Sequence, residues 1–296
     1  MRETFAATPT TTRMARHSTV NKRDAFVPEL LALCRMHCGS ACGRRGAQNC
    51  SLLAATDSVN RPFIQCGSCG FVFNPPPYRE TNEHTMPSAD TYVKNMLSID
   101  GLGYMHHEAE KAFACFAAAR SAELARSGQA PRLLEVGSAL GFLLATFRSV
   151  GWDVRGYEMW PAWRRFGREM LRLPISGGNI FNATFARGGG YDMIILTQVY
   201  EHVADFARMM DTLHSLLVPG GMLFISVPNF ELGPRHNAQS FAGEAMALDN
   251  TFHINHWSLE SLRAAAVHAG GFRPEQTFLT TRGDRGGWEI VLYAVR

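Results

Sequence analysis

This chain of 296 residues lacks features that would each point to a particular class of protein. No apolar run approaches the roughly 20 residues of a membrane-spanning helix, and the N-terminus has no apolar core of a secretory signal. The 29 Lys and Arg residues are nearly balanced by 26 Asp and Glu residues, without a basic block to follow phosphates. We therefore expect a soluble, cytoplasmic monomer or homodimer that binds a small molecule, with neither nucleic acid nor membrane as a partner.

A missing glycine narrows the class of cofactor. The segment Leu133-Leu134-Glu135-Val136-Gly137-Ser138-Ala139-Leu140-Gly141 predicts a buried strand, a tight turn and the start of a helix. A dinucleotide site normally has a second glycine at the position of Ala139, where the backbone approaches the pyrophosphate. Glu135 would repel a pyrophosphate but suits a cationic ligand that carries an ammonium and a sulfonium. These residues predict S-adenosylmethionine as the cofactor.

Further stretches follow this motif in a defined order, namely Tyr191–Leu196, Gln198–Val203 and Leu217–Leu223. With the glycine turn, they make residues 130–296 similar to class I S-adenosylmethionine-dependent methyltransferases. Strands and helices alternate in this region, which is typical of a mainly parallel sheet with helices on both faces. The resemblance implies an α/β fold with a Rossmann-like, seven-stranded sheet whose last strand is antiparallel.

Residues just after the strands are the candidates for cofactor binding, because ligands of open α/β sheets bind outside the carboxyl ends of the strands. Glu158 follows the strand predicted over 152–157, and its carboxylate can accept hydrogen bonds from both ribose hydroxyls. The resemblance implies that Glu135 shapes the turn and reaches the methionine moiety. Gly141 is expected mainly to allow close packing of helix and strand. The other predicted cofactor residues are Gly137, Ser138, Ala139, Met159, Asn179, Ile180 and Gln198.

A general base is helpful but optional for methyl transfer, which depends mostly on positioning the nucleophile. The candidates for this base are His202, His253 and His256, with Tyr200 behind them. The spacing of His253 and His256 would also suit a metal, but the sequence shows no third ligand nearby, and a metal is not expected there. Residues 230–256 are predicted to form a lid in which the acceptor is recognised.

Cysteine is concentrated in one segment, which holds six of the seven cysteines. In a reducing compartment such clustering indicates metal binding rather than disulfides. The stretch Cys66-Gly67-Ser68-Cys69-Gly70 has the spacing of a zinc knuckle, and residues 66–77 resemble the zinc-binding module that precedes many small-molecule and sugar methyltransferases. The resemblance implies a structural zinc ion, with Cys42 or His37 as substitutes for one ligand. The predicted ligands are Cys34, Cys38, Cys66 and Cys69.

The chain therefore divides into a disordered arm at 1–28, a zinc-binding module at 29–77, a helical connector and cap at 78–129, and the cofactor domain at 130–296. Two helices are expected between 92 and 126, and a terminal β-hairpin over 272–295. The predicted activity is methylation of a small molecule, at a hydroxyl of a sugar or natural-product intermediate. Methylation of a sugar carbon remains open, as do two other classes: an NAD-dependent oxidoreductase and a non-catalytic scaffold held by its zinc module.

Overall fold

The computed structural model describes most of the region from residue 89 onward and parts of the cysteine-rich segment. The described residues are 50–56, 62–67, 70–74, 89–178, 180–182, 190–230, 253–282 and 285–296. Several predictions lie outside them: the arm at 1–28, residues 231–252 of the lid predicted over 230–256, the cofactor residue Asn179, and the zinc ligands Cys34, Cys38 and Cys69 with the substitutes Cys42 and His37.

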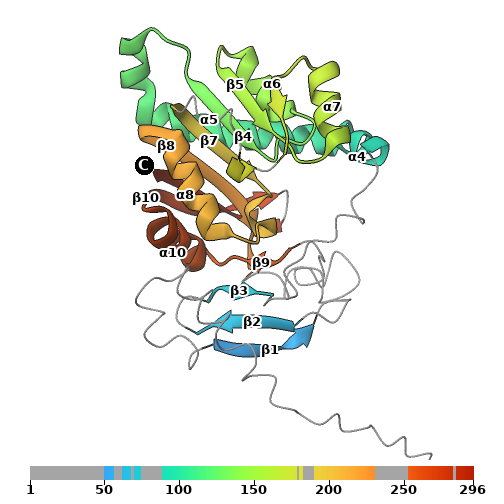
Figure 1. The fold of residues 1–296 in the computed structure, drawn as a ribbon, viewed down its shortest axis with the longest axis vertical. Coiled ribbons are helices and arrows are strands. Elements are labelled where there is room, and N and C mark those ends of the chain that lie inside the picture. Colours follow the sequence, from blue (N-terminus) through green and yellow to red (C-terminus); the bar gives the residue numbers. More distant parts are fainter. Residues whose placement is uncertain are drawn as a thin grey trace, which may run out of the picture.

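A mixed sheet of seven strands forms the centre of the molecule, in the order β10-β11-β8-β7-β4-β5-β6 (Figure 1). The neighbours from β8 to β6 pair in parallel, whereas β11 runs antiparallel to both β8 and β10. This arrangement confirms the predicted α/β sheet and its antiparallel end. The strands are β4 (Arg132–Val136), β5 (Asp153–Tyr157), β6 (Ile175–Ser176), β7 (Tyr191–Thr197), β8 (Leu217–Pro228), β10 (Arg273–Arg282) and β11 (Arg285–Val295).

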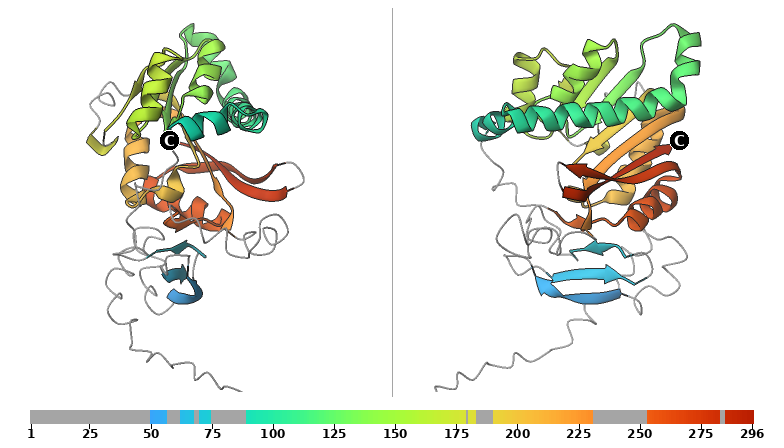
Figure 2. Two further views of the ribbon diagram at one scale, coloured as in Figure 1. Left: turned by 90° about the vertical axis from the view of Figure 1, so that its right-hand side faces the viewer. Right: turned by 180° about the vertical axis from the view of Figure 1, so that it is seen from behind.

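Helices cover both faces of this sheet, and each face has its own apolar core (Figure 2). On one face, Phe116 of α5 and Phe147 of α6 pack around Trp152. On the other face, α8 and α10 contribute Leu213 and Leu262. Among the described residues, every helix is too short or too polar to span a bilayer. The helices are α4 (Ala89–Met96), α5 (Ile99–Ser127), α6 (Phe142–Ser149), α7 (Pro161–Glu169), α8 (Phe206–Leu216) and α10 (Leu259–Gly270), with the short 3-10 turns η2 (Ile180–Asn182) and η4 (Tyr200–His202).

Most helix boundaries follow their local sequence signals. Ser258 caps α10 with a capping box that includes Ser261, as its position before an apolar run predicts. The helix α7 begins with Pro161 in its first turn and ends at Glu169. The chain turns there through Arg172, whose φ is +54°, and Leu173 is buried beside the glycine turn.

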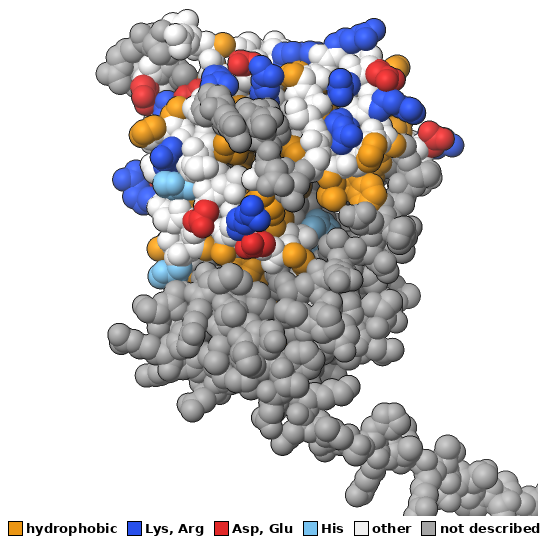
Figure 3. All heavy atoms as spheres, viewed as in Figure 1, with side chains coloured by type: hydrophobic (Ala, Val, Ile, Leu, Met, Phe, Trp, Pro, Cys, Tyr) orange, Lys and Arg blue, Asp and Glu red, His pale blue; other side chains and the backbone are white. Residues whose placement is uncertain are grey.

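Lys and Arg side chains on the face of Figure 3 lie mainly over the end of the molecule that carries α6 and α7.

A second, smaller sheet joins the cysteine-rich segment to the cofactor domain. It consists of β1 (Cys50–Thr56), β2 (Pro62–Cys66), β3 (Val72–Phe73) and β9 (Asn255–His256), in that order. Because β9 belongs to the C-terminal half of the chain, the predicted zinc module and the cofactor domain share one sheet. Phe71 stacks on Trp257 with ring centroids 4.7 Å apart, which places both residues in a common core.

Backbone hydrogen bonds join Cys66, at the end of β2, to Gly70 and Phe71. Gly70 has a φ of +71° and donates its N–H to the carbonyl of Cys66, whose own N–H is bonded to the carbonyl of Phe71. The chain therefore folds round Cys66, whose side chain is buried. Zinc itself stays a prediction, because the other three expected ligands lie outside the described residues.

Candidate active site at the carboxyl edge of the sheet

The turn after β4 holds an unusual backbone conformation. Gly137, Ala139 and Gly141 all have positive φ, at +74°, +47° and +86°. A Cβ on Gly137 would lie 2.3 Å from Cγ2 of Val199, and one on Gly141 would lie 2.5 Å from Cδ1 of Leu173. Such distances leave no space for a side chain at either glycine. The turn is therefore packed closely against Val199 of the loop after β7 at Gly137 and against Leu173 at Gly141.

Glu158 lies at the end of β5 and holds this turn in place. Its Oε2 accepts a hydrogen bond from the N–H of Ala139 at 2.8 Å, and its Oε1 accepts one from the N–H of Trp160 at 2.8 Å. Burial raises the pKa of the carboxyl, and the hydrogen bonds from these two N–H groups partly offset that rise. Each oxygen keeps a second lone pair that a ribose hydroxyl could use, so the predicted role remains compatible with the geometry.

The other predicted cofactor residues differ in how accessible they are. Glu135 and Ser138 are buried beneath the turn, and the hydroxyl of Ser138 faces Gly156 of β5. Burial, with the nearby charge of Glu158, raises the pKa of Glu135 well above its ordinary value. Met159 is exposed, whereas Ile180 packs into the core beside the site. A buried acid with a raised pKa becomes easier to ionise when a cation binds nearby.

Gln198 begins the loop after β7, and its side chain is bonded to a residue of β11. Its φ is +54°, and its side-chain Nε2 donates to Oε1 of Glu289 at 3.1 Å. The other oxygen of Glu289 pairs with Lys111 of α5 at 3.1 Å. The contact of Gln198 with the cofactor, through backbone or side chain, stays a prediction. Glu289 was missed in the sequence, although an acid at the start of the apolar run Ile290–Val295 marks this same edge of the sheet.

Glu108 of α5 is a second acid beside the interacting side chains of Gln198, Glu289 and Lys111. Glu108 is fully buried and forms an ion pair with Lys111. Burial raises the pKa of Glu108 to about 7, the charge of Glu289 adds to the rise, and Lys111 lowers it. The N-terminal half of α5 therefore brings charged groups to the carboxyl edge, a contribution that its alanine-rich sequence did not indicate.

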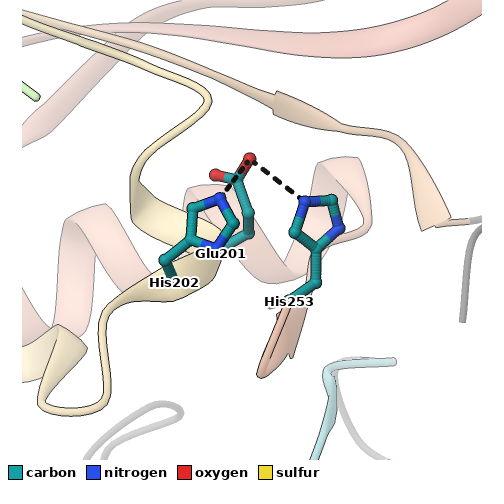
Figure 4. Close-up of side chains that lie close together, drawn as sticks. All are labelled: Glu201, His202 and His253. Carbon is teal, nitrogen blue, oxygen red and sulfur yellow. Dashed lines mark ion pairs between the residues drawn. The ribbon is translucent and has the colours of Figure 1, made fainter. Parts of the chain in front are cut away.

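Glu201, His202 and His253 form a compact cluster at η4 (Figure 4). The Nε2 atoms of both histidines lie 3.8 Å from Oε1 of Glu201, and the two rings are 4.8 Å apart between centroids. The backbone N–H of Ile254 donates to the carbonyl of Glu201, which fixes the His253 segment beside η4. One ligand atom from each residue lies within 4.8 Å of the others, a spacing that could hold a metal ion.

The environment of Glu201 differs sharply from that of Glu158. Its side chain is 1% exposed, and neither carboxylate oxygen accepts a hydrogen bond from another described residue. Burial raises the pKa of Glu201 to about 8, its own backbone N–H lowers it partway, and the charge of Glu289 raises it. The site therefore contains a buried acid whose partners are two imidazoles just beyond hydrogen-bond distance.

Two other predicted catalytic residues are buried and packed against aromatic side chains. Tyr200 is fully buried, stacks on Trp257 at 4.9 Å and donates its hydroxyl to the carbonyl of Phe206 at 3.1 Å. His256 lies in β9, with its ring edge-on to Phe63 at 5.0 Å. Both side chains are therefore buried and packed against aromatic rings, and a role of either in proton transfer stays a prediction. His253 and His256 do not converge as a pair of ligands either, since their ring centroids are 6.3 Å apart.

Comparison with protein families gives a match over more than half of the chain. Residues 105–277 match a family described as methyltransferase domain. The ubiquinone biosynthesis O-methyltransferase of Rhizobium etli is 28% identical over 134 residues, covering 43% of this chain and 51% of that protein. The enzyme of the same name from Sinorhizobium fredii is 30% identical over 104 residues, covering 33% of this chain and 41% of that protein. The chain thus spans about half the length of the curated relatives that it matches.

Solved structures show the same fold at low identity. An O-methyltransferase family protein from Burkholderia thailandensis superposes with a TM-score of 0.51 at 16% identity, over 72% of this chain and 60% of that one. A Listeria monocytogenes protein described as a candidate S-adenosylmethionine-dependent methyltransferase gives 0.50 at 11% identity, over 65% of this chain and 97% of that one. The seven-stranded arrangement is therefore that of these proteins.

Proposed function

Since the chain belongs to this family of methyltransferase domains, we propose that it transfers a methyl group from S-adenosylmethionine to a hydroxyl of a small molecule. The observation that carries the proposal is the contact between the glycine turn and the loop after β7. A Cβ on Gly137 would overlap Val199, which is two residues before Glu201. The predicted cofactor site and the Glu201 cluster thereby adjoin at one edge of the sheet, as transfer between two ligands requires.

The residues around the turn fit a cationic nucleoside. The backbone at Gly137 and Ala139 adopts positive φ, and the buried acids Glu135 and Glu158 lie beneath and beside the turn. In the proposed complex, Glu158 accepts from the ribose hydroxyls, Glu135 faces the methionine end, and Ile180 packs on the adenine. S-adenosylmethionine, when bound, supplies a methyl group already activated by its sulfonium. The chain must then position the acceptor oxygen and keep water from the site.

Support for an oxygen acceptor comes from the relatives, which are named as O-methyltransferases. Sugars and natural-product intermediates are the favoured acceptors, on the resemblance of the cysteine-rich segment to modules that precede such methyltransferases. We propose that this segment binds a structural zinc ion through Cys34, Cys38, Cys66 and Cys69. Methylation of a sugar carbon is the variant of this proposal, and it differs only in the atom that is positioned beside the Glu201 cluster.

A ligand screen tests the cofactor. We expect S-adenosylhomocysteine to raise the melting temperature of the full chain, because a ligand that binds the folded state alone stabilises it. NAD should leave the melting temperature unchanged. The opposite result, stabilisation by NAD alone, would replace the methyltransferase by an oxidoreductase.

Glu158→Ala tests the site itself. The substitution removes a charged acceptor from two N–H groups and from the proposed ribose contact, so affinity for S-adenosylhomocysteine should fall about 10-fold to 100-fold in calorimetry. Glu169→Ala, at the exposed end of α7, is the matched control and should keep the wild-type affinity. Unchanged affinity in Glu158→Ala would favour a non-catalytic scaffold.

The acceptor is found by incubating the protein and S-adenosylmethionine with fractionated metabolites. Mass spectrometry should detect a product heavier than its precursor by one methylene group. A mass increase on a compound without a free hydroxyl would shift the proposal to carbon methylation.

A further inference from the structure

Three side chains of types that bind metal ions, Glu201, His202 and His253, lie together beside the predicted cofactor site, although they come from two distant segments. Glu201 and His202 end η4, whereas His253 precedes β9. The hydrogen bond from the N–H of Ile254 to the carbonyl of Glu201, at 3.0 Å, ties the segments together. Figure 4 shows both imidazoles turned toward one oxygen of Glu201, at 3.8 Å from each Nε2. The cluster thus presents two nitrogen donors and one oxygen donor to a common point.

The state of Glu201 is the second, independent observation. This side chain is 1% exposed, and within the described part of the chain neither of its oxygens accepts a hydrogen bond from another residue. A buried carboxyl without hydrogen-bond partners is costly, so it is retained where a ligand satisfies it. A spacing of 3.8 Å is too long for a hydrogen bond. Two donors that each lie about 2.1 Å from one tetrahedral cation are about 3.4 Å apart, so a shift of a few tenths of an ångström would let both imidazoles and the carboxylate share an ion.

We propose that Glu201, His202 and His253 bind a divalent first-row transition metal ion. Two imidazoles and one carboxylate on one side of an ion leave positions open on the other side, as in catalytic metal sites. The hydroxyl of the acceptor would bind at an open position. There the ion would lower the pKa of that hydroxyl, as a bound ion does for water. This use of the ion rests on the proposed function, whereas the binding of the ion does not.

This site differs from the metal site that the spacing of His253 and His256 suggests. His256 is fixed in β9 against Phe63 and is absent from the cluster. The missing third ligand comes instead from η4, fifty or so residues earlier in the chain, where Glu201 and His202 are adjacent. It also differs from the predicted zinc site, whose ligands are all thiolates. Carboxylate ligands suit Mn²⁺, whereas thiolates select softer ions such as Zn²⁺, so Mn²⁺ is a probe that distinguishes this site from the predicted zinc site.

The test is a titration of the chelator-treated full chain with Mn²⁺, followed by the loss of the electron paramagnetic resonance signal of the free ion. We expect one Mn²⁺ per wild-type chain. Glu201→Gln and His253→Asn should each weaken binding at least about 10-fold to 100-fold, since even residues that only orient a metal ligand have effects of that size. His106→Asn is the control, because His106 pairs with Glu110 at 3.0 Å on the exposed surface of α5 and should keep wild-type binding.

Binding of S-adenosylhomocysteine is measured on the same samples to show that each variant folds. Variants that bind S-adenosylhomocysteine but not Mn²⁺ support the proposal. Wild-type protein that binds S-adenosylhomocysteine without binding Mn²⁺ would overturn the metal site and leave the proposed function intact. Equal Mn²⁺ affinity in the wild type and in Glu201→Gln would also overturn it. Mn²⁺ binding without any binding of S-adenosylhomocysteine or NAD would instead remove the proposed function.

Discussion

The two halves of the candidate site differ in the hydrogen bonds that a buried carboxylate accepts. In the cofactor half, formed by residues 135–141 and Glu158, the Glu158 carboxylate accepts two backbone hydrogen bonds at 2.8 Å. In the acceptor half, formed by Glu201, His202 and His253, the carboxylate of Glu201 accepts none from another described residue. Hydrogen bonds offset much of the cost of burying a charge, so the first half is preorganised by the chain alone. Among the described residues, the second half leaves the Glu201 carboxyl without such hydrogen bonds, a cost that the proposed metal ion would offset.

The largest effect is expected where the two halves touch, at Gly137. The substitution Gly137→Ala would place a Cβ 2.3 Å from Cγ2 of Val199 and would keep an L residue at a φ of +74°. The left-handed backbone costs about 1–2 kcal/mol and the overlap about 1–3 kcal/mol, so the free energy of unfolding should fall by about 2–5 kcal/mol. Urea denaturation measures this change, and S-adenosylhomocysteine affinity should fall with it.

Gly128→Ala is the matched control for this prediction. Gly128 also has a positive φ, at +63°, but a Cβ there would have no atom within 4 Å. Its substitution should cost only the backbone part, about 1–2 kcal/mol, and should leave the affinity for S-adenosylhomocysteine unchanged. If the free energy of unfolding falls equally in both variants, the Val199 side chain can move away from the new Cβ at little cost. The packing between the two halves would then be looser than the distances indicate.

The same division decides how much could be predicted from the sequence. The cofactor half lies within residues 135–158, where strand, turn and helix follow one another, so the glycines and Glu158 could be assigned from spacing. The acceptor half depends on the pairing of β9 with β3 and on the contact of Ile254 with Glu201, which no local pattern encodes. The sequence therefore offered no third ligand beside His253 and His256, because Glu201 and His202 approach His253 only in the folded chain. Glu289 was missed for the same reason, since it meets Gln198 across the sheet.

Glu108 offers an intermediate case, because it is buried but has Lys111 as a partner. Its pKa is raised from 4.5 to about 7 by burial first and by Glu289 next. The folded state therefore holds this proton more tightly than the unfolded state. Stability from this group is complete below about pH 4.5 and is lost as the pH rises to about 7.

Glu108→Gln should remove that dependence on pH. Relative to the wild type, the variant should gain about 3 kcal/mol in unfolding free energy between pH 4.5 and pH 8, measured by urea denaturation at each pH. Glu110→Gln changes an exposed acid on the same helix and should leave the pH dependence as it is in the wild type. A flat difference between Glu108→Gln and wild type across this range would mean that Lys111 balances the buried charge fully. Glu108 would then resemble Glu158 more than Glu201.

The smallest effect is expected at Tyr200, which lies next to Glu201 in sequence but belongs to the core. Tyr200→Phe keeps the ring stacked on Trp257 and removes one hydrogen bond, from the hydroxyl to the carbonyl of Phe206. The free energy of unfolding should fall by about 1 kcal/mol, while Mn²⁺ binding and methyl transfer should stay at the wild-type level. Thermal unfolding, the Mn²⁺ titration and the rate with the identified acceptor measure these three quantities. If the rate instead fell about 100-fold while stability stayed unchanged, the Tyr200 hydroxyl would belong to the acceptor half and would take part in the reaction.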